Sequence, residues 1–198
     1  MLLALAVSLL LPAGDPPVRL KISDDVFVRG ERVRVKVKTT QNGYLLVLRA
    51  NAQGRVRVLF PVEPGDDGAI RGGKETEVRG RGGREAFTVD DAEGSGKIIA
   101  AFSAQPFQFD GFTRAGHWDY AALAATDSVA GDAEASLLAL VDRMSSGAYD
   151  YDLVTYTVTA HPRFRQSPWA WGDPGRWGGS GGGRYGPRFG CLRCRRWL

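Results

Sequence analysis

The sequence predicts a mainly β protein: an antiparallel β-sandwich, immunoglobulin-like or related, with one packed α-helix and a disordered C-terminal tail rich in Gly, Arg and Trp. Three observations lead to this fold class. Apolar and polar residues alternate with period two through most of residues 18–103, as in half-buried strands. Gly, Asn and Pro separate these runs at short, regular spacing, which is typical of sandwiches and barrels. One segment alone, residues 132–146, repeats its apolar residues with helical spacing.

The alternating runs give the expected strands in chain order. Each run is short and is bounded by a turn residue or by a change of pattern. We expect strands at residues 18–22, 25–28, 32–39, 44–49, 55–60, 75–78, 85–89, 97–103 and 149–159.

The clearest of these runs is the third. Val33, Val35 and Val37 would all face one side of a strand, as a half-buried antiparallel strand requires. The residues between them are basic and would face solvent, so the charged side is a candidate interaction surface. Its members are Arg32, Arg34, Lys36 and Lys38.

Turn residues connect this run to the next two. Gln41-Asn42-Gly43 favours a tight turn, because Asn and Gly tolerate positive φ, and we expect residues 40–44 to form a hairpin. The run at residues 44–49 is apolar enough to be covered on both faces. Residues 51–54 predict another turn, and Pro61 ends the strand that follows, because proline cannot donate to a sheet ladder.

The helix is expected over residues 132–146. Asp132 is a suitable N-cap, and Gly147 is placed as the residue that stops the helix. Its apolar stripe must pack on another element, most simply the sheet. The stripe consists of Leu137, Leu140, Val141 and Met144.

Charge divides the chain into a body and a tail. The 198 residues are 43% hydrophobic, enough for one domain with a core, and carry a net charge of +4. Residues 161–198 contain eight Arg and one Asp, a net of +7, so the rest of the chain has a net of −3. We therefore expect a signal peptide at residues 1–14, a sandwich domain at 15–160, and a basic, disordered tail at 161–198.

The expected signal peptide rests on an apolar run. Residues 2–11 read LLALAVSLLL, and Pro12, Ala13, Gly14 and Asp15 follow. A helix that crosses a bilayer needs ~20 residues, so this run has the length of a signal-peptide core and not that of a membrane anchor. The expectation is export to the periplasm or the extracellular space.

The tail has the composition of a polyanion-binding segment. Residues 172–190 include nine Gly, which prevents the packing of a core, interleaved with Arg and aromatic residues. Arg contacts phosphates and aromatic rings stack on bases, so single-stranded nucleic acid or another polyanion is the expected ligand if the tail binds; the alternatives are a flexible tail without a partner and a reading-frame artefact. The expected contacts are Arg176, Trp177, Arg184, Tyr185, Arg188, Arg193, Arg195 and Arg196.

The body resembles the bacterial domain of unknown function 4384, over roughly residues 18–105. The likeness lies in the motifs Val28-Arg29-Gly30-Glu31-Arg32-Val33-Arg34-Val35, Gly43-Tyr44-Leu45-Leu46-Val47-Leu48 with Gly54, Val58-Leu59-Phe60-Pro61, Ile70 and Gly72-Gly73. The resemblance implies a β-rich module of exported or envelope-linked bacterial proteins. It implies no catalytic residue.

The residues that could carry chemistry form no complete catalytic set. A hydrolase would have to use His117 with a neighbouring carboxylate such as Asp119, and Ser95 lies in a segment that we interpret as a turn. Cys191 and Cys194 form a lone C-x-x-C, whereas a zinc site needs four ligands. We therefore expect no catalytic residue and no cofactor.

Acidic groups in loops offer oxygen atoms of the kind that Ca²⁺ prefers, but none has the spacing of a calcium loop, so we expect no metal site. The groups are Asp66-Asp67, Asp90-Asp91 with Glu93, and Asp150 with Asp152.

Together these features predict a non-enzymatic, exported module that binds a protein or another component of the cell envelope. The alternatives are polyanion or single-stranded nucleic-acid binding through the tail, and hydrolysis at His117.

Overall fold

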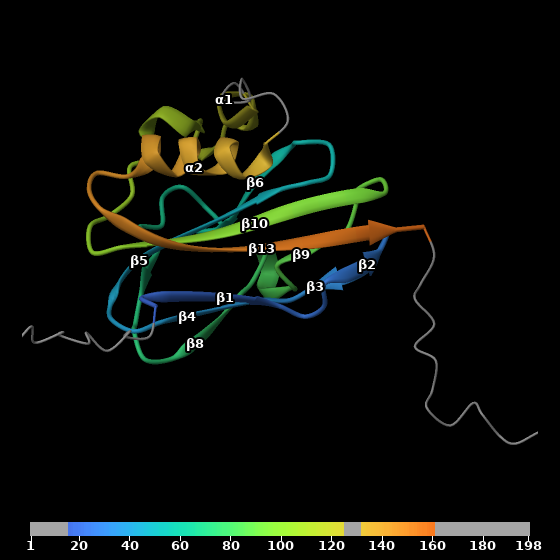
Figure 1. Cartoon of the computed structure of the whole chain (residues 1–198). Coiled ribbons are helices and arrows are strands. Elements are labelled where there is room, and N and C mark those ends of the chain that lie inside the picture. The colour runs from blue at the N-terminus through green and yellow to red at the C-terminus, as the bar shows by residue number, and fades with distance from the viewer. Residues whose placement is uncertain (1–15, 125–131, 161–198) are drawn as a thin grey trace, which may run out of the picture. The chain divides into compact units, whose positions relative to one another are not determined.

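The computed structural model describes residues 16–124 and 132–160. These residues form three layers (Figure 1): a three-stranded sheet, a larger central sheet, and a layer of helices on the far side of the central sheet. We call the three-stranded sheet the outer sheet. The fold is mainly β, as predicted.

The outer sheet has the strand order β1-β4-β8, and the central sheet has the order β2-β13-β10-β5-β6, with β7 also paired to β5. Two small antiparallel pairs, β3-β9 and the hairpin β11-β12, complete the strands. The strands are β1 (Val18–Ile22), β2 (Val26–Val28), β3 (Arg32–Val33), β4 (Val35–Thr39), β5 (Gly43–Ala50), β6 (Val56–Phe60), β7 (Ala69–Ile70), β8 (Glu75–Val78), β9 (Phe87–Thr88), β10 (Gly94–Ser103), β11 (Thr113–Arg114), β12 (His117–Trp118) and β13 (Tyr149–Thr159). The helices are η1 (Arg81–Gly83), η2 (Asp110–Phe112), α1 (Tyr120–Ala124) and α2 (Ala133–Met144).

The central sheet is buried on both faces. Along β5, Leu45 and Val47 face the outer sheet, whereas Leu46 and Leu48 face the helices, and all four have no exposed surface. Because successive side chains of a strand point to opposite faces, a strand that is apolar at every position must be covered twice. The prediction that residues 44–49 are covered on both faces is confirmed.

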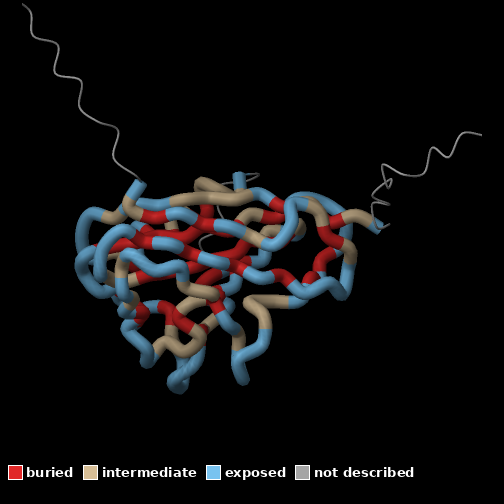
Figure 2. The backbone as a smooth tube through the Cα atoms, turned by 90° about the horizontal axis from the view of Figure 1, so that it is seen from below, coloured by how far each residue is buried: buried red, intermediate tan, exposed pale blue. Residues whose placement is uncertain are grey.

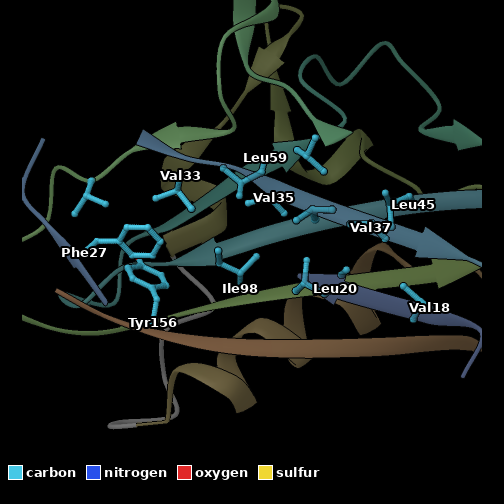
Figure 3. Close-up of a cluster of buried hydrophobic side chains, with 14 of the residues drawn as sticks. Val18, Leu20, Phe27, Val33, Val35, Val37, Leu45, Leu59, Ile98 and Tyr156 are labelled. Carbon is cyan, nitrogen blue, oxygen red and sulfur yellow. The ribbon is translucent and has the colours of Figure 1, made fainter. Parts of the chain in front are cut away.

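The first core lies between the two sheets (Figure 3). Val18 and Leu20 of β1 and Val35 and Val37 of β4 point toward the central sheet, where Ile98 is among the residues that they meet. Seen from the side of the outer sheet, the strands alternate between buried and exposed residues (Figure 2). This alternation is the period-two pattern of the sequence.

The second core lies between the central sheet and the helices. Leu137, Leu140, Val141 and Met144 of α2 are fully buried there, so the predicted apolar stripe and its packing on the sheet are confirmed. Asp132 caps the helix as predicted: its Oδ1 accepts a hydrogen bond from the Glu134 N–H at 2.9 Å. The helix ends earlier than expected, at Met144. Its C-cap is Ser145, whose backbone is extended and not left-handed, so the prediction that Gly147 stops the helix was wrong.

Two predictions about the region from Arg32 to Tyr44 were wrong. Residues 32–39 form two strands, because the chain changes partners at Arg34: β3 pairs with β9, whereas β4 pairs with β1 and β8. Residues 40–44 are not a hairpin, since β4 and β5 belong to different sheets and the segment crosses between them. Glycine is required at position 43 because the backbone of Ser103 approaches it closely, and not because of a turn: a Cβ there would lie 2.5 Å from the Ser103 carbonyl oxygen.

Other differences concern lengths and short elements. The strand expected at residues 85–89 is reduced to β9, and Ser95 lies within β10, not in a turn. The pair β2-β13 is parallel in an otherwise antiparallel sheet. The short helix α1 and the hairpin β11-β12 were not expected, so α2 is not the only packed helix.

The close contact between Gly96 and Tyr156 generates a stability prediction. A Cβ at Gly96 would overlap the ring of Tyr156, which is fully buried and held on the neighbouring strand. We expect Gly96→Ala to lower the free energy of unfolding by about 1–3 kcal/mol or more, because overpacking strains a filled core. Gly65→Ala is the control, since nothing lies within 4 Å of its Cβ position. Equal urea midpoints for the two variants would contradict this account.

Candidate functional site

The predicted basic surface lies on the outward face of the outer sheet, but its membership differs from the prediction. Lys36 and Lys38 are exposed on β4, and Arg34 is exposed just before that strand. Arg32 lies in β3, which pairs with β9 and not with the outer sheet, and its side chain pairs with Glu85 at 3.5 Å. Two unpredicted residues join the surface, because Arg19 and Lys21 of β1 are the cross-strand partners of Lys38 and Lys36. We call the five residues Arg19, Lys21, Arg34, Lys36 and Lys38 the basic face.

Two carboxylates on β8 partly balance this charge. Glu75 accepts a hydrogen bond from Lys36 Nζ at 2.7 Å, and Glu77 pairs with Arg79 at 3.0 Å. The hydrogen bond and charge of Lys36, with the charges of Lys21 and Lys38, lower the pKa of Glu75 below its usual value. The basic face therefore keeps a surplus of positive charge.

Charge is also divided between the two halves of the body. Residues 16–97, which include the whole outer sheet, contain 16 basic and 12 acidic residues. Residues 98–160, which include both α-helices and β13, contain two basic and eight acidic residues. The basic face thus belongs to the positive half of an acidic body.

A buried ion pair lies between the sheets at one end of the sandwich. Arg49 of β5 is 2% exposed, and its Nη2 donates to Asp91 Oδ2 at 2.5 Å. Its Nε donates to the Tyr156 hydroxyl at 2.7 Å, and this hydroxyl donates to Asp91 Oδ2 at 2.8 Å. We call Arg49, Asp91 and Tyr156 the buried triad. Sequence reasoning missed it because its members come from three distant segments.

The surroundings of the triad favour a charged Arg49 and a neutral Tyr156. Burial, together with the hydrogen bond to Asp91, raises the pKa of the Tyr156 hydroxyl. The Arg49 guanidinium also lies over the ring of Phe87, 4.0 Å from its centroid. Asp90 lies 3.5 Å from Arg49. Burial acts to raise the pKa of this carboxyl, but the charge of Arg49, the hydrogen bond with Asp91 and the charge of Arg57 outweigh burial, and the pKa is lowered.

A cleft of about 660 Å³ opens beside the triad, with Arg49 as part of its wall. One wall comes from β6, another from β9 and the segment before it, and a third from β12 and the start of α1. The side chains that give the cleft its chemistry are Arg57, Arg81, Phe87, Asp90, His117 and Trp118.

His117 lies at this cleft but not in the predicted arrangement with Asp119. Its Nδ1 is 3.5 Å from Glu63 Oε2, and Arg81 pairs with the other oxygen of Glu63 at 2.8 Å. Asp119 instead accepts hydrogen bonds from the N–H groups of Ala121 and Ala122 at the start of α1. The carboxylate beside His117 is therefore Glu63 and not Asp119.

The candidate calcium ligands have structural partners. Asp66 and Asp67 accept hydrogen bonds from the N–H groups of Gly68 and Ala69 within their own loop. Asp152 accepts from the N–H of Leu20 at 2.7 Å and so joins β13 to the edge of the outer sheet. Within residues 16–124 and 132–160, no three His, Cys, Asp or Glu side chains gather in a way that could hold a metal ion.

Several predictions fall outside the described residues. These are the signal peptide at residues 1–14, the disorder of the tail, Cys191 and Cys194, and the tail contacts named above. In the part of the chain that is described, no helix is both long and apolar enough to span a membrane.

The buried triad predicts different stability effects for substitutions at two adjacent carboxylates, Asp90 and Asp91. Asp91→Asn leaves Arg49 without its buried counter-charge, and we expect the free energy of unfolding to fall by about 3–5 kcal/mol. Asp90→Asn, at a side chain that is 47% exposed, should lower it by less than about 1 kcal/mol. Urea unfolding followed by circular dichroism measures both. If Asp91→Asn were as mild as Asp90→Asn, the ion pair would not be a stabilising element.

Comparison with known proteins gives one family match, over part of the body. Residues 26–106 match the family described as a domain of unknown function, DUF4384. A search of curated proteins found no match. The matched segment runs from the start of β2 past the end of β10, so it includes β4, β5 and β6 but neither α2 nor β13. The match over residues 26–106 is to the same domain of unknown function 4384 that the motifs of the sequence resemble.

Proposed function

We propose that the protein is a non-enzymatic binding module of the cell envelope, which docks on anionic phospholipid headgroups through the basic face. The observation that carries this proposal is the cluster of five cations on one exposed sheet face, beside which β8 places the carboxylates Glu75 and Glu77. Because the face is one side of an open sheet, its cations can approach a planar surface together.

Elementary electrostatics supports the proposed orientation. A Lys or Arg near an anionic membrane surface contributes about 1 kcal/mol, so a surplus of several cations gives weak, salt-sensitive binding. The acidic half of the body, with both α-helices and β13, would be repelled by the same surface. The module would then bind with the outer sheet toward the headgroups.

The non-enzymatic part of the proposal is supported by what the polar groups of the body already do. Glu63 is shared by His117 and Arg81, Asp119 caps α1, and Ser95 lies in a strand. Asp119 and Ser95 thus have structural places.

A second candidate function is polyanion binding by residues 161–198, favoured by their net charge of +7 and their interleaved Arg, Gly and aromatic residues. In this second candidate the binding residues lie in residues 161–198, whereas in the first proposal they lie on the basic face. All described strands and helices, and both cores, lie before residue 161, so a chain that ends at residue 160 keeps all of these residues.

The location at the envelope is supported by the apolar run at residues 2–11. We expect cell fractionation to find the protein outside the cytoplasm, with a mass reduced by removal of about 14 residues. Intact, unprocessed protein in the cytoplasm would contradict export.

Vesicle binding tests the basic face. We expect cosedimentation with phosphatidylcholine vesicles that contain phosphatidylglycerol, little binding to phosphatidylcholine alone, and weaker binding as salt rises. The variant Lys21→Glu/Lys38→Glu should weaken binding at least tenfold. The control Arg55→Glu/Arg114→Glu changes net charge equally at exposed sites away from the outer sheet and should bind nearly as the unaltered protein does.

The same assay separates the two candidate functions. A chain that ends at residue 160 should keep its vesicle binding if the basic face carries it. Binding that disappears with the tail and is unaffected by Lys21→Glu/Lys38→Glu would assign the function to the tail. Equal loss in both double-charge variants would mean that net charge alone is sensed.

A further inference from the structure

The cleft beside the buried triad has the size and lining of a small-molecule site. Its volume of about 660 Å³ falls within the range of typical ligand pockets, roughly 300–1,000 Å³. Apolar and aromatic side chains contribute to its wall, among them Val58, Leu59, Phe87 and Trp118. Tyr120 stands at its edge and is 50% exposed, although large aromatic side chains are usually buried.

The charged groups of the cleft supply more donors than acceptors. Arg81 and His117 share the single carboxylate of Glu63. Arg57 and Arg49 share Asp90, and the approach of Arg57 Nη2 to Asp90 Oδ2 is long, 3.7 Å. A guanidinium has five N–H donors and no acceptor. Because two cations share each carboxylate, the carboxylates cannot accept from all of these donors, and the remaining donors are available in the cleft.

Arg57 is the most available of these groups. Its side chain is 56% exposed, and it has no hydrogen-bond partner within residues 16–124 and 132–160 beyond the long contact to Asp90. It lies 6.0 Å from the ring centroid of Tyr120, which places a cation and a flat apolar surface side by side. Arg57 of β6 is also the cross-strand partner of Arg49 on β5, and the hydrogen bonds of the buried triad fix the side chain of Arg49.

We propose that this cleft binds an organic anion: a small molecule with a carboxylate, sulfonate or phosphate group and an aromatic or apolar body. The anionic group pairs with Arg57, within the cleft that Arg81 and His117 also line, since a planar guanidinium matches such groups through two parallel hydrogen bonds. The apolar body lies against Phe87, Trp118 and Tyr120. This site is separate from the basic face and does not depend on it.

Two matched fluorescent probes test the site on the full-length protein. The first is 8-anilinonaphthalene-1-sulfonate, an aromatic anion, and the second is N-phenyl-1-naphthylamine, which has the same ring system without the charge. We expect saturable, one-to-one binding of the anionic probe, at least tenfold tighter than that of the uncharged probe. Arg57→Gln should weaken the anionic probe about tenfold and change the uncharged probe less than twofold.

Further variants keep the outcome unambiguous. Like Arg57→Gln, Arg81→Gln should lower the affinity for the anionic probe. Tyr120→Ala should lower the affinity for both probes. Arg55→Gln, an exposed Arg on the same β5-β6 hairpin but not in the cleft wall, is the control and should bind both probes unchanged. Equal affinity for the two probes, or unaltered binding of the anionic probe by both Arg57→Gln and Arg81→Gln, would overturn the proposal. Lys21→Glu/Lys38→Glu should leave probe binding intact, which separates this test from that of the basic face.

Discussion

The whole architecture follows from one constraint: the central strands β5 and β10 are apolar on both faces. Such strands cannot end at solvent on either side, so the chain must supply two covers. The outer sheet provides one and the helices the other, and each closes its own core. The single charged residue that points from β5 toward the outer sheet, Arg49, has to be neutralised where it is buried. Asp91 and Tyr156 converge on it for that reason, and Arg49 and Phe87 line the cleft beside them.

The sequence pattern predicted the elements better than their pairing. The bounds of β1, β8 and β13 agree with prediction because alternation and flanking Gly are local signals, read within a few residues. Partner choice is not local. The segment Gln41–Gly43 has the composition of a hairpin turn, yet it crosses between sheets, because β5 is apolar on both faces and belongs to the central sheet. The break at Arg34 escaped prediction for a related reason: the Val alternation continues unbroken across it while the hydrogen-bonded partner changes.

The same distinction explains what could be predicted of the candidate sites. Lys36 and Lys38 were evident from one strand, but Arg19 and Lys21 join them only through the register of β1 against β4. The buried triad joins residues 42 and 107 positions apart, a separation that no short pattern encodes. One signal was present: Arg49 is the only charged residue in the apolar run of β5, and a buried cation requires a counter-charge elsewhere in the chain. The cleft had no such signal, since its walls come from four separate segments.

The path of β13 has a mechanical consequence. β1 lies beside the first half of β13, tied to it by the bond from Leu20 to Asp152, whereas β13 ends next to Val28 at the other end of the sandwich (Figure 1). At about 3.3 Å per residue, the 11 residues of β13 separate these ends by roughly 33 Å. Tension applied between Val18 and Thr159 would therefore act along the strands, in shear. The hydrogen bonds between paired strands are perpendicular to the strand direction, so a force along the strands would load all of them at once. A force that pulls adjacent ends of two paired strands apart would instead break the hydrogen bonds one after another. The ladders that would be loaded in this way are β1-β4 in the outer sheet and β10-β13 in the central sheet.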